Sequence, residues 1–413
     1  MEHDLTVKPY QYIKALSMTL ELSTTGISKH HLGTAILCKA FGEALNLDHR
    51  EMQTLIVAAL LHDIGAASQW EEKLFIVHND NDDRIFDHAE KGYHILNQFP
   101  LLKDVALVVR YHHDRYSGSN PSGFIGDEIP LLSRILHFAD RIDVLIDLNK
   151  NIMLQKESIT IDILSSVFYD PKLFPIFEHL ALKESFWLNI VSVEYEYLFD
   201  DFDSFFGKYE LNIDDLIDLS KIFASIIDAS SLYTYNHSYN VANVAKLLSK
   251  QNFEDESMHK KFYLAGLLHD LGKLAVPNQI LNKQGRLDDI EILLMKQHPY
   301  YSMFILAKVE GFEDLANWVG HHHEFEDGFG YPDRLVASEI NIGIRILQLA
   351  DIFCALTENR PYRKALNNQE IINELMKFVK QKKLDNSMVQ QISNKIESFV
   401  QCVNRNVEQK SVN

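Results

Sequence analysis

Two adjacent histidine–aspartate pairs, His62 with Asp63 and His269 with Asp270, are the first features of this sequence that could carry chemistry. Each pair follows an almost wholly apolar run, residues 54–61 in one case and 262–268 in the other. A helix that is apolar on all sides is buried, and burying a carboxylate is very costly unless it is paired or bound to a metal. The sequence therefore predicts two buried sites in which these aspartates bind a metal, cap a helix or pair with a histidine.

Further histidines and aspartates accompany both pairs in the same order, so the chain has the pattern of a tandem repeat. Equivalent positions in five blocks of sequence are separated by 206 to 211 residues. The first set is His31, His62, Asp63, His88, His112, His113 and Asp140, and the second is His237, His269, Asp270, His298, His322, His323 and Asp351. We expect two domains, residues 1–205 and 206–413, each formed by one copy of the unit.

The ligand types in these sets restrict the metal and its chemistry. Imidazole and carboxylate ligands without thiolates suit iron, manganese, nickel or zinc rather than calcium. Seven ligands exceed what one metal needs, so we expect two ions ~3.5–4 Å apart, bridged by the aspartate of the His-Asp pair. Such a pair activates water near neutral pH and stabilises the attacking and leaving oxygens of a displacement at phosphorus. Phosphoester hydrolysis is the predicted reaction.

The elements that position these side chains are expected to be helices. The chain has only 17 glycines and 10 prolines in 413 residues, whereas sandwiches and barrels need many turns rich in these residues. Apolar residues recur at helical spacing in residues 211–228 and after residue 366. We therefore predict an all-α fold.

Charge and cysteine content exclude several classes of protein. A net charge of −18 disfavours binding to duplex nucleic acid, which relies on a basic face. Cys38, Cys354 and Cys402 share no close spacing, so neither a disulfide framework nor a CxxC zinc site is indicated. The N-terminus lacks signal-peptide features, and no apolar run approaches the ~18 residues of a membrane span. We expect a cytoplasmic protein that binds neither duplex nucleic acid nor membrane.

Three motifs in the second repeat resemble the signatures of the HD-GYP domain, a branch of the HD phosphohydrolase superfamily. They are HDLGK at 269–273, HHEFEDGFGYP at 322–332 and ADIFCALTENRPYRKA at 350–365. The first repeat resembles a plain HD domain over residues 25–150. The resemblance implies two tandem HD-type helical domains and a metal-dependent phosphodiesterase of cyclic dinucleotides.

The resemblance also implies roles for individual residues. The second set of seven residues would hold the metals, and Asp270 and Lys273 would be catalytic. Substrate phosphate would be bound by Lys273, Arg360 and Arg363, where arginine offers a bidentate fork. The loop beside the site would be shaped by Asp327, Gly328, Gly330, Tyr331 and Pro332. Glu324 is expected to orient a ligand histidine, and His321 to flank the site.

The number of metals follows from a departure from the family pattern. Family members with a third metal carry a glutamate four residues before the first histidine, where this chain has Tyr233; an aspartate often found two residues further back is Ser231. We therefore expect two divalent metals, iron or manganese, with nickel or zinc as alternatives.

The first repeat departs further from the family pattern. Its seven-residue ligand set is complete, but Ala66 replaces the lysine of HDxGK, the GYP motif is absent and no RPYR follows Asp140. Two interpretations stay open: a metal site without cyclic dinucleotide activity, and a second phosphohydrolase such as a 5′-phosphatase that acts on the linear product.

The resemblance implies hydrolysis of cyclic di-GMP or 3′3′-cGAMP to the linear 5′-phosphorylated dinucleotide, with a second cut to mononucleotides left open. The motifs do not decide between the two substrates, because residues that read the bases lie outside them. Alternatives are a catalytically idle receptor of a cyclic dinucleotide and a general nucleotide phosphohydrolase. A homodimer and docking of a diguanylate-cyclase-type domain are also left open.

Overall fold

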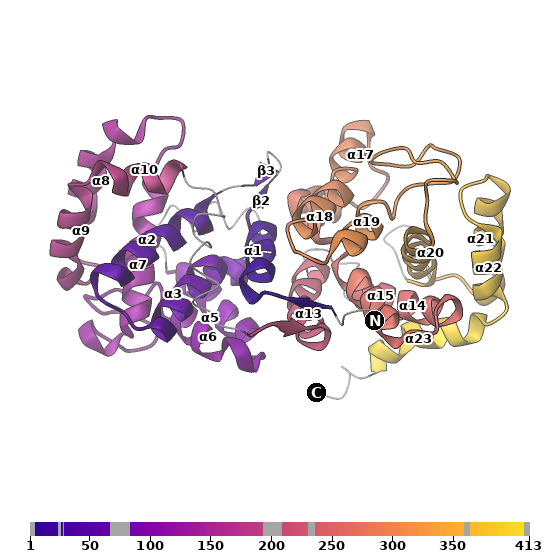
Figure 1. Ribbon diagram of the computed structural model, residues 1–413, viewed down its shortest axis with the longest axis horizontal. Helices are drawn as coiled ribbons and strands as arrows, with labels where there is room; N and C mark the ends of the chain where they lie inside the picture. The colour runs from indigo at the N-terminus through magenta and orange to yellow at the C-terminus, as the bar shows by residue number, and fades with distance from the viewer. Residues whose placement is uncertain are drawn as a thin grey trace. The chain divides into compact units, whose positions relative to one another are not determined.

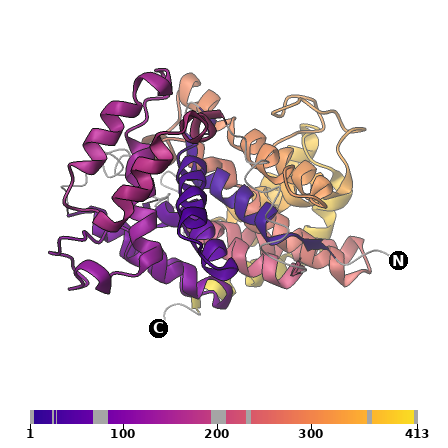
Figure 2. The ribbon, with the colours of Figure 1, turned by 60° about the vertical axis from the view of Figure 1, so that its left-hand side comes forward.

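The computed structural model describes residues 5–23, 26–27, 29–66, 83–192, 209–229, 236–358 and 364–408. Within these ranges the regular secondary structure is almost all helix (Figures 1 and 2). Each strand is two residues long. The predicted all-α fold class is confirmed. In the same ranges, no helix combines the length and apolar character needed to cross a membrane.

The chain divides into two compact units. We call the first the N-terminal unit; it comprises Lys8–Glu21 and Ile27–Tyr209. The C-terminal unit comprises Glu210–Asn413 together with Met1–Val7 and Leu22–Gly26. The division into domains at residues 205 and 206 stays a prediction.

The described part of the N-terminal unit consists mainly of α-helices and short 3-10 helices. Its elements are α1 (Pro9–Leu20), α2 (His30–Ala44), α3 (His49–Leu61), η1 (His62–Ala66), α5 (Ile85–Leu96), η2 (Pro100–Leu102), α6 (Lys103–Arg110), η3 (Gly126–Glu128), α7 (Leu131–Val144), η4 (Ile152–Leu154), α8 (Lys156–Leu164), η5 (Pro171–Leu173), α9 (Phe174–Ala181) and α10 (Glu184–Ser192).

The C-terminal unit has the same helical character. Its helices are α13 (Ile213–Ala229), α14 (His237–Asn252), α15 (Glu256–Leu268), η6 (Leu271–Ala275), α16 (Asn278–Leu281), α17 (Asp289–Met295), α18 (His298–Leu306), α19 (Glu313–Gly320), α20 (Ile342–Thr357), α21 (Asn368–Lys380), α22 (Asn386–Ser393) and α23 (Ile396–Glu408).

Short strands complete the fold. In the C-terminal unit, β1 (Thr6–Val7) pairs antiparallel with β4 (Leu211–Asn212), with Thr6 opposite Asn212. The remaining strands are β2 (Leu22–Ser23) and β3 (Gly26–Ile27).

The helices that carry the predicted ligands recur in the same order in both units. The order α2, α3, η1, α5, α6, α7 in one unit is matched by α14, α15, η6, α18, α19, α20 in the other. α3 and α15 are both preceded by an N-cap aspartate, Asp48 or Asp255, whose side chain accepts a hydrogen bond from a first-turn N–H. Both helices are buried in their last turns and end directly before the His-Asp pair.

A glycine follows each His-Asp pair and allows another helix to approach it closely. A Cβ on Gly65 would lie 2.0 Å from the carbonyl oxygen of His88, and a Cβ on Gly272 would lie 2.0 Å from that of His298. Only a residue without a side chain fits at these positions. Each glycine thus brings the helix with the third predicted histidine against the His-Asp pair.

Candidate metal centres

Helix ends position most of the predicted ligands of the C-terminal unit. His237 is the first residue of α14 and His298 the first of α18, whereas His269 follows the last residue of α15. His322 and His323 lie just after α19, beyond its C-cap residue His321, and Asp351 lies within α20. Five separate helices therefore deliver these side chains to one place, which we call the C-terminal centre.

Asp270 lies between two groups of ligands in this centre. Its Oδ2 is 3.0 Å from His269 Nε2 and 3.9 Å from His237 Nε2, whereas its Oδ1 is 3.3 Å from His298 Nε2. Asp351 Oδ1 lies 3.1 Å from His237 Nε2. The two oxygens of one carboxylate thus face different histidines, as a carboxylate that bridges two ions would.

The ligands form two triplets whose donor atoms lie close together. Ligand atoms of His237, His269 and Asp351 all lie within 4.8 Å of one another, and the same holds for His298, His322 and His323. We call them the His237 group and the His298 group. The structure brings together all seven residues predicted for this centre.

The second ring nitrogen of several histidines is already used. Nδ1 contacts a backbone carbonyl oxygen in His269 (Gly266, 2.8 Å), His298 (Met295, 2.7 Å) and His322 (Val319, 2.6 Å). Their Nε2 atoms, together with Asp270 Oδ1, are buried without a well-aligned hydrogen bond. Buried polar atoms normally make hydrogen bonds. These nitrogen and oxygen atoms do not make well-aligned ones, which fits a role as metal ligands.

The ionisation states of His298, His322 and Asp270 also suit metal binding. Burial lowers the pKa of His298 to about 3 and that of His322 to about 4, so both rings are neutral near pH 7. Burial opposes the charge on Asp270, yet His269 and Lys273 hold the pKa of this carboxyl well below its usual range. Neutral imidazole and ionised carboxylate are the forms that bind metals.

His237 differs from His269, His298 and His322 because its Nδ1 contacts a carboxylate instead of a backbone carbonyl oxygen. Glu358 Oε2 lies 3.0 Å from this nitrogen. Burial opposes a charge on the ring, but the carboxylates of Glu358 and Asp351 outweigh it and raise the pKa of His237 to about 10. Sequence reasoning did not identify Glu358, although this residue lies within the third signature at residues 350–365. The family resemblance implies roles only for Asp351, Arg360 and Arg363 of that signature.

Lys273 lies at the more exposed side of the centre. Its Nζ is 2.5 Å from Asp270 Oδ2, and its side chain is 20% exposed, compared with 3% for Asp270. Asp351 is 13% exposed, so solvent reaches the centre near these two residues. Arg360 and Arg363, predicted to bind phosphate, lie outside the described residues.

The predicted loop lies against the His298 group. The ring of Tyr331 is 4.9 Å from that of His323, and the Tyr331 N–H donates to the His323 carbonyl oxygen. Gly328 has a φ of +75°, and a bridge between Asp327 and Val336 closes the turn. Pro332 follows Tyr331 through a cis peptide bond.

Glu324 has a different role from the one expected of it. Its carboxylate is fully buried and accepts hydrogen bonds from the backbone N–H groups of Asp333, Arg334 and Leu335 at 2.6 to 3.0 Å. A Cβ on Gly330 would lie 2.4 Å from the Cα of Glu324. Glu324 therefore holds the loop after the GYP motif instead of orienting a ligand histidine. His321 likewise binds this loop, through Asp333 Oδ2 at 2.9 Å.

The N-terminal unit contains a similar cluster, which we call the N-terminal centre. Asp63 Oδ2 is 3.4 Å from His31 Nε2, and Asp63 Oδ1 is 3.4 Å from His62 Nε2 and 3.5 Å from His88 Nε2. His88, His112 and His113 form a fully buried triplet whose ligand atoms lie within 4.8 Å of one another. Burial lowers the pKa of His112 and of His113 well below the usual range.

His30, which was not predicted, occupies the position equivalent to His237. It is the first residue of α2, as His237 is the first residue of α14. Its Nε2 lies 3.2 Å from Asp140 Oδ1 and 3.8 Å from Asp63 Oδ2, and its Nδ1 lies 2.7 Å from Asp143 Oδ2. The sequence signal was present: His30 is separated from His237 by 207 residues, the same spacing as between the two His-Asp pairs.

The N-terminal centre also differs in where its cation lies. Ala66 stands in place of Lys273, whereas Arg141 donates to Asp140 Oδ2 from Nε at 3.0 Å and from Nη2 at 2.7 Å. Arg141 is 5% exposed. Burial opposes ionisation of Asp140, but Arg141 and His30 hold the pKa of this carboxyl well below its usual range.

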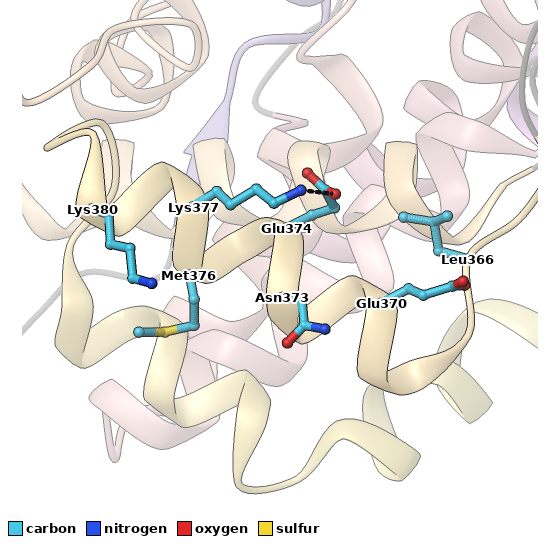
Figure 3. Close-up of a pocket in the computed structure, with 7 residues that line it drawn as sticks. All are labelled: Leu366, Glu370, Asn373, Glu374, Met376, Lys377 and Lys380. Atoms are coloured by element: carbon cyan, nitrogen blue, oxygen red, sulfur yellow. Dashed lines mark hydrogen bonds and ion pairs between the residues drawn. The ribbon is translucent and has the colours of Figure 1, made fainter.

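A shallow hollow in the C-terminal unit is separate from this chemistry. Among the described residues, Leu366 and one side of α21, with Met376 and Lys380, line it (Figure 3). Lys377 in this hollow pairs with Glu374 at 2.6 Å. None of the predicted ligands lines it, so we do not assign it to the metal chemistry.

Comparison with known proteins gives the context of these centres. The family model described as "HD domain" matches residues 14–172 and 221–388. The chain is 29% identical to the 3′3′-cGAMP-specific phosphodiesterase 1 of Vibrio cholerae, over 92% of this chain and 90% of the relative. It is 30% identical to the 3′3′-cGAMP-specific phosphodiesterase 3 of the same organism, over 85% of this chain and 78% of the relative.

A further relative matches a shorter part of the chain. A cyclic di-GMP phosphodiesterase of Pseudomonas aeruginosa is 37% identical over 37% of each chain. Among solved structures, the crystal structure of a cyclic GMP-AMP specific phosphodiesterase of V. cholerae, V-cGAP3, superposes with a TM-score of 0.67 at 24% identity and covers 95% of this chain and 98% of that chain. This likeness shows that the two chains share a fold.

Proposed function

The chain belongs to the HD domain family, and we propose that it is a metal-dependent phosphodiesterase that opens a cyclic dinucleotide to the linear 5′-phosphorylated form. The observation that carries the proposal is Asp270, whose two oxygens face the His237 group and the His298 group separately. Relatives named as cyclic dinucleotide phosphodiesterases support the same reaction.

Two divalent ions, iron or manganese in preference to nickel or zinc, would be held in the C-terminal centre. His237, His269 and Asp351 would hold one ion, His298, His322 and His323 the other, and Asp270 would contact both. Bound ions would activate water and stabilise charge on the scissile phosphate. The buried donor atoms without well-aligned hydrogen bonds support this assignment.

Lys273 is the residue proposed to act on the substrate. Its side chain is flexible, positively charged and partly exposed beside Asp270. When the ions neutralise Asp270, the ammonium group is available to a phosphate oxygen, where it offsets developing charge or assists the leaving oxygen. Arg360 and Arg363 are proposed to bind phosphate on the basis of their motif alone.

The substrate we favour is 3′3′-cGAMP. The relatives that match both units over most of their length are named as specific for this nucleotide, whereas the named cyclic di-GMP phosphodiesterase of P. aeruginosa matches 37% of the chain. Cyclic di-GMP is the second candidate.

We further propose that the N-terminal centre binds metal but does not open the ring. Its ligands would be His30, His62, Asp63, Asp140 and the buried His88, His112 and His113 triplet, with His31 beside Asp63. It lacks a mobile cation at the position of Lys273, because Ala66 stands there. A metal content near two per chain that is unchanged by His62→Ala would contradict metal binding in this unit.

A competition assay tests the main proposal. The chain loaded with Mn²⁺ or Fe²⁺ receives equal amounts of 3′3′-cGAMP and cyclic di-GMP, and the products are resolved by mass spectrometry. We expect preferential opening of 3′3′-cGAMP that Asp270→Ala abolishes. Preferential opening of cyclic di-GMP would overturn the substrate assignment, and binding of both nucleotides without ring opening would overturn the catalytic proposal.

A further inference from the structure

His30, the first residue of α2, and His237, the first residue of α14, differ from the other predicted ligands in what their Nδ1 atoms contact. Nδ1 of His62, His112, His269, His298 and His322 contacts a backbone carbonyl oxygen. Nδ1 of His30 instead contacts Asp143 Oδ2 at 2.7 Å, and Nδ1 of His237 contacts Glu358 Oε2 at 3.0 Å. The same nitrogen therefore meets a carboxylate twice in one chain.

The two carboxylates come from different places in the repeat. Asp143 lies on α7, three residues after Asp140, whereas Glu358 follows the end of α20, seven residues after Asp351. Because Asp140 and Asp351 are equivalent, the residue equivalent to Asp143 is Cys354. Neither carboxylate is thus a simple copy of the other.

The residue three positions after each of these histidines also differs between the two units, in a way that matches the carboxylate. Gly33 lies three residues after His30, and a Cβ at this position would be 1.9 Å from Asp143 Oδ1. The absence of a side chain thus makes room for Asp143. In the C-terminal unit the equivalent residue is Asn240, whose Nδ2 donates to Glu358 Oε1 at 2.8 Å. A glycine accommodates one carboxylate, and an asparagine binds the other.

These matched differences between the units indicate that a carboxylate is required at Nδ1 of the histidine. Two different pairs, Gly33 with Asp143 and Asn240 with Glu358, deliver an oxygen to the same ring nitrogen of equivalent histidines. An acceptor at Nδ1 directs Nε2 towards the aspartates of the centre, and a charged acceptor makes the ring a stronger ligand. A merely structural contact would have no reason to be rebuilt from different residues.

We propose that Glu358 and Asp143 are positioning residues, each of which holds the helix-first histidine of its unit, His237 or His30, with Nε2 presented to a metal. The inference rests on the proposed metal centres and deepens them. Removing such an outer partner of a ligand histidine typically weakens metal binding by about 10- to 100-fold. Glu358 acts on the proposed catalytic centre, so it provides the sharper test.

The metal-free chain is titrated with Mn²⁺ in a His62→Ala background, which removes the N-terminal centre from the measurement. We expect Glu358→Ala to weaken binding by about 10- to 100-fold and Glu358→Gln, which keeps an acceptor oxygen but loses the charge, to weaken it less. The matched control is Asp147→Ala. Asp147 is equivalent to Glu358 by position, but its carboxylate binds Asn149 and Lys150, so affinity should not change.

A rescue variant separates positioning from stability. Asn240→Gly with Cys354→Asp, added to Glu358→Ala, rebuilds in the C-terminal unit the arrangement that Gly33 and Asp143 have in the other unit. We expect Mn²⁺ affinity to return towards that of the parent chain. Unchanged affinity in Glu358→Ala would overturn the proposal, and so would a folded rescue variant that stays as weak as Glu358→Ala.

NMR of the histidine side chains distinguishes a failure of the positioning proposal from a failure of the proposed metal centres. In the metal-free chain with ¹⁵N-labelled histidine, the Nδ1–H of His237 should exchange slowly and lose this protection in Glu358→Ala. If the parent chain binds no metal but shows this signal, the proposed metal centre fails and the contact stands. If it binds metal and the signal is unaffected by Glu358→Ala, the positioning role fails and the proposed function stands.

Discussion

Replacing Gly272 by alanine should disable the C-terminal centre without removing any ligand. The added Cβ would lie 2.0 Å from the carbonyl oxygen of His298 and 2.8 Å from its carbonyl carbon, whereas real Cβ contacts essentially never fall below 3.0 Å. The start of α18 must therefore move by about 1 Å, and His298 moves with it. Overpacking of this kind costs about 1–3 kcal/mol of stability.

The catalytic cost should exceed the cost in stability. His298 Nε2 lies 3.3 Å from Asp270 Oδ1, so a shift of about 1 Å changes the separation of the two ligand groups by a large fraction. Misplacement by 1 Å can reduce a rate by about 100-fold. We expect Gly272→Ala to lower kcat for ring opening by about this factor and to lose one of the two ions proposed for the C-terminal centre.

The chain contains a matched control for this experiment. Gly65 has the same 2.0 Å approach to the carbonyl oxygen of His88 in the N-terminal unit. Gly65→Ala should reduce the free energy of unfolding by a similar amount, measured by urea denaturation, and leave ring opening at the parental rate. A Gly272→Ala chain with parental kcat and parental metal content would refute the reasoning.

Three further outcomes are expected. Lys273→Met should reduce kcat by about 100-fold or more with metal content retained; activity lost only together with metal would contradict the role of this residue in acting on phosphate. Glu324→Ala should lower the free energy of unfolding by about 2–4 kcal/mol, since three backbone N–H groups lose a charged acceptor, and an unchanged urea midpoint would argue against this. Burial raises the pKa of Asp228 to about 6 from 3.8, so its contribution to stability is full below pH 3.8 and is lost as the pH rises through 6. Asp228→Asn should therefore flatten the pH dependence of unfolding between these values, and an unaltered slope would contradict the assignment.

The all-α fold could be predicted because its signal is distributed along the sequence. Scarce glycine and proline, apolar runs before each His-Asp pair and the internal repeat all agree with helices of this order. The segments Met1–Val7 and Leu22–Gly26, which belong to the C-terminal unit, could not be predicted. Thr6 pairs with Asn212 across about 200 residues, and β2 contacts η6 at a similar distance along the chain. Strands of two residues leave no periodic pattern that would reveal such contacts.

The ligands of the centres were easier to predict than the residues that support them. Histidine and aspartate are recognisable by type and order, and all seven predicted residues of the C-terminal centre lie together. Glu324 and Glu358 carry no such signal, because a glutamate in a sequence does not show whether it faces a ring nitrogen or a backbone N–H. His30 was missed because its neighbour His31 is also a histidine. The two differ only in their spacing from His237, which is 207 residues for His30 and 206 for His31.

The two centres place their cations differently, and this difference limits what each can do. Lys273 contacts Asp270 from the partly exposed side, and its flexible side chain can turn from the carboxylate towards an incoming phosphate. Arg141 is buried, and two of its N–H groups are held by Asp140, so turning towards a substrate would leave a buried carboxylate without its partner. Breaking a buried ion pair in this way costs about 3–5 kcal/mol. Of these two cations, therefore, only Lys273 could assist a leaving oxygen at low cost, although the two centres share a similar ligand geometry.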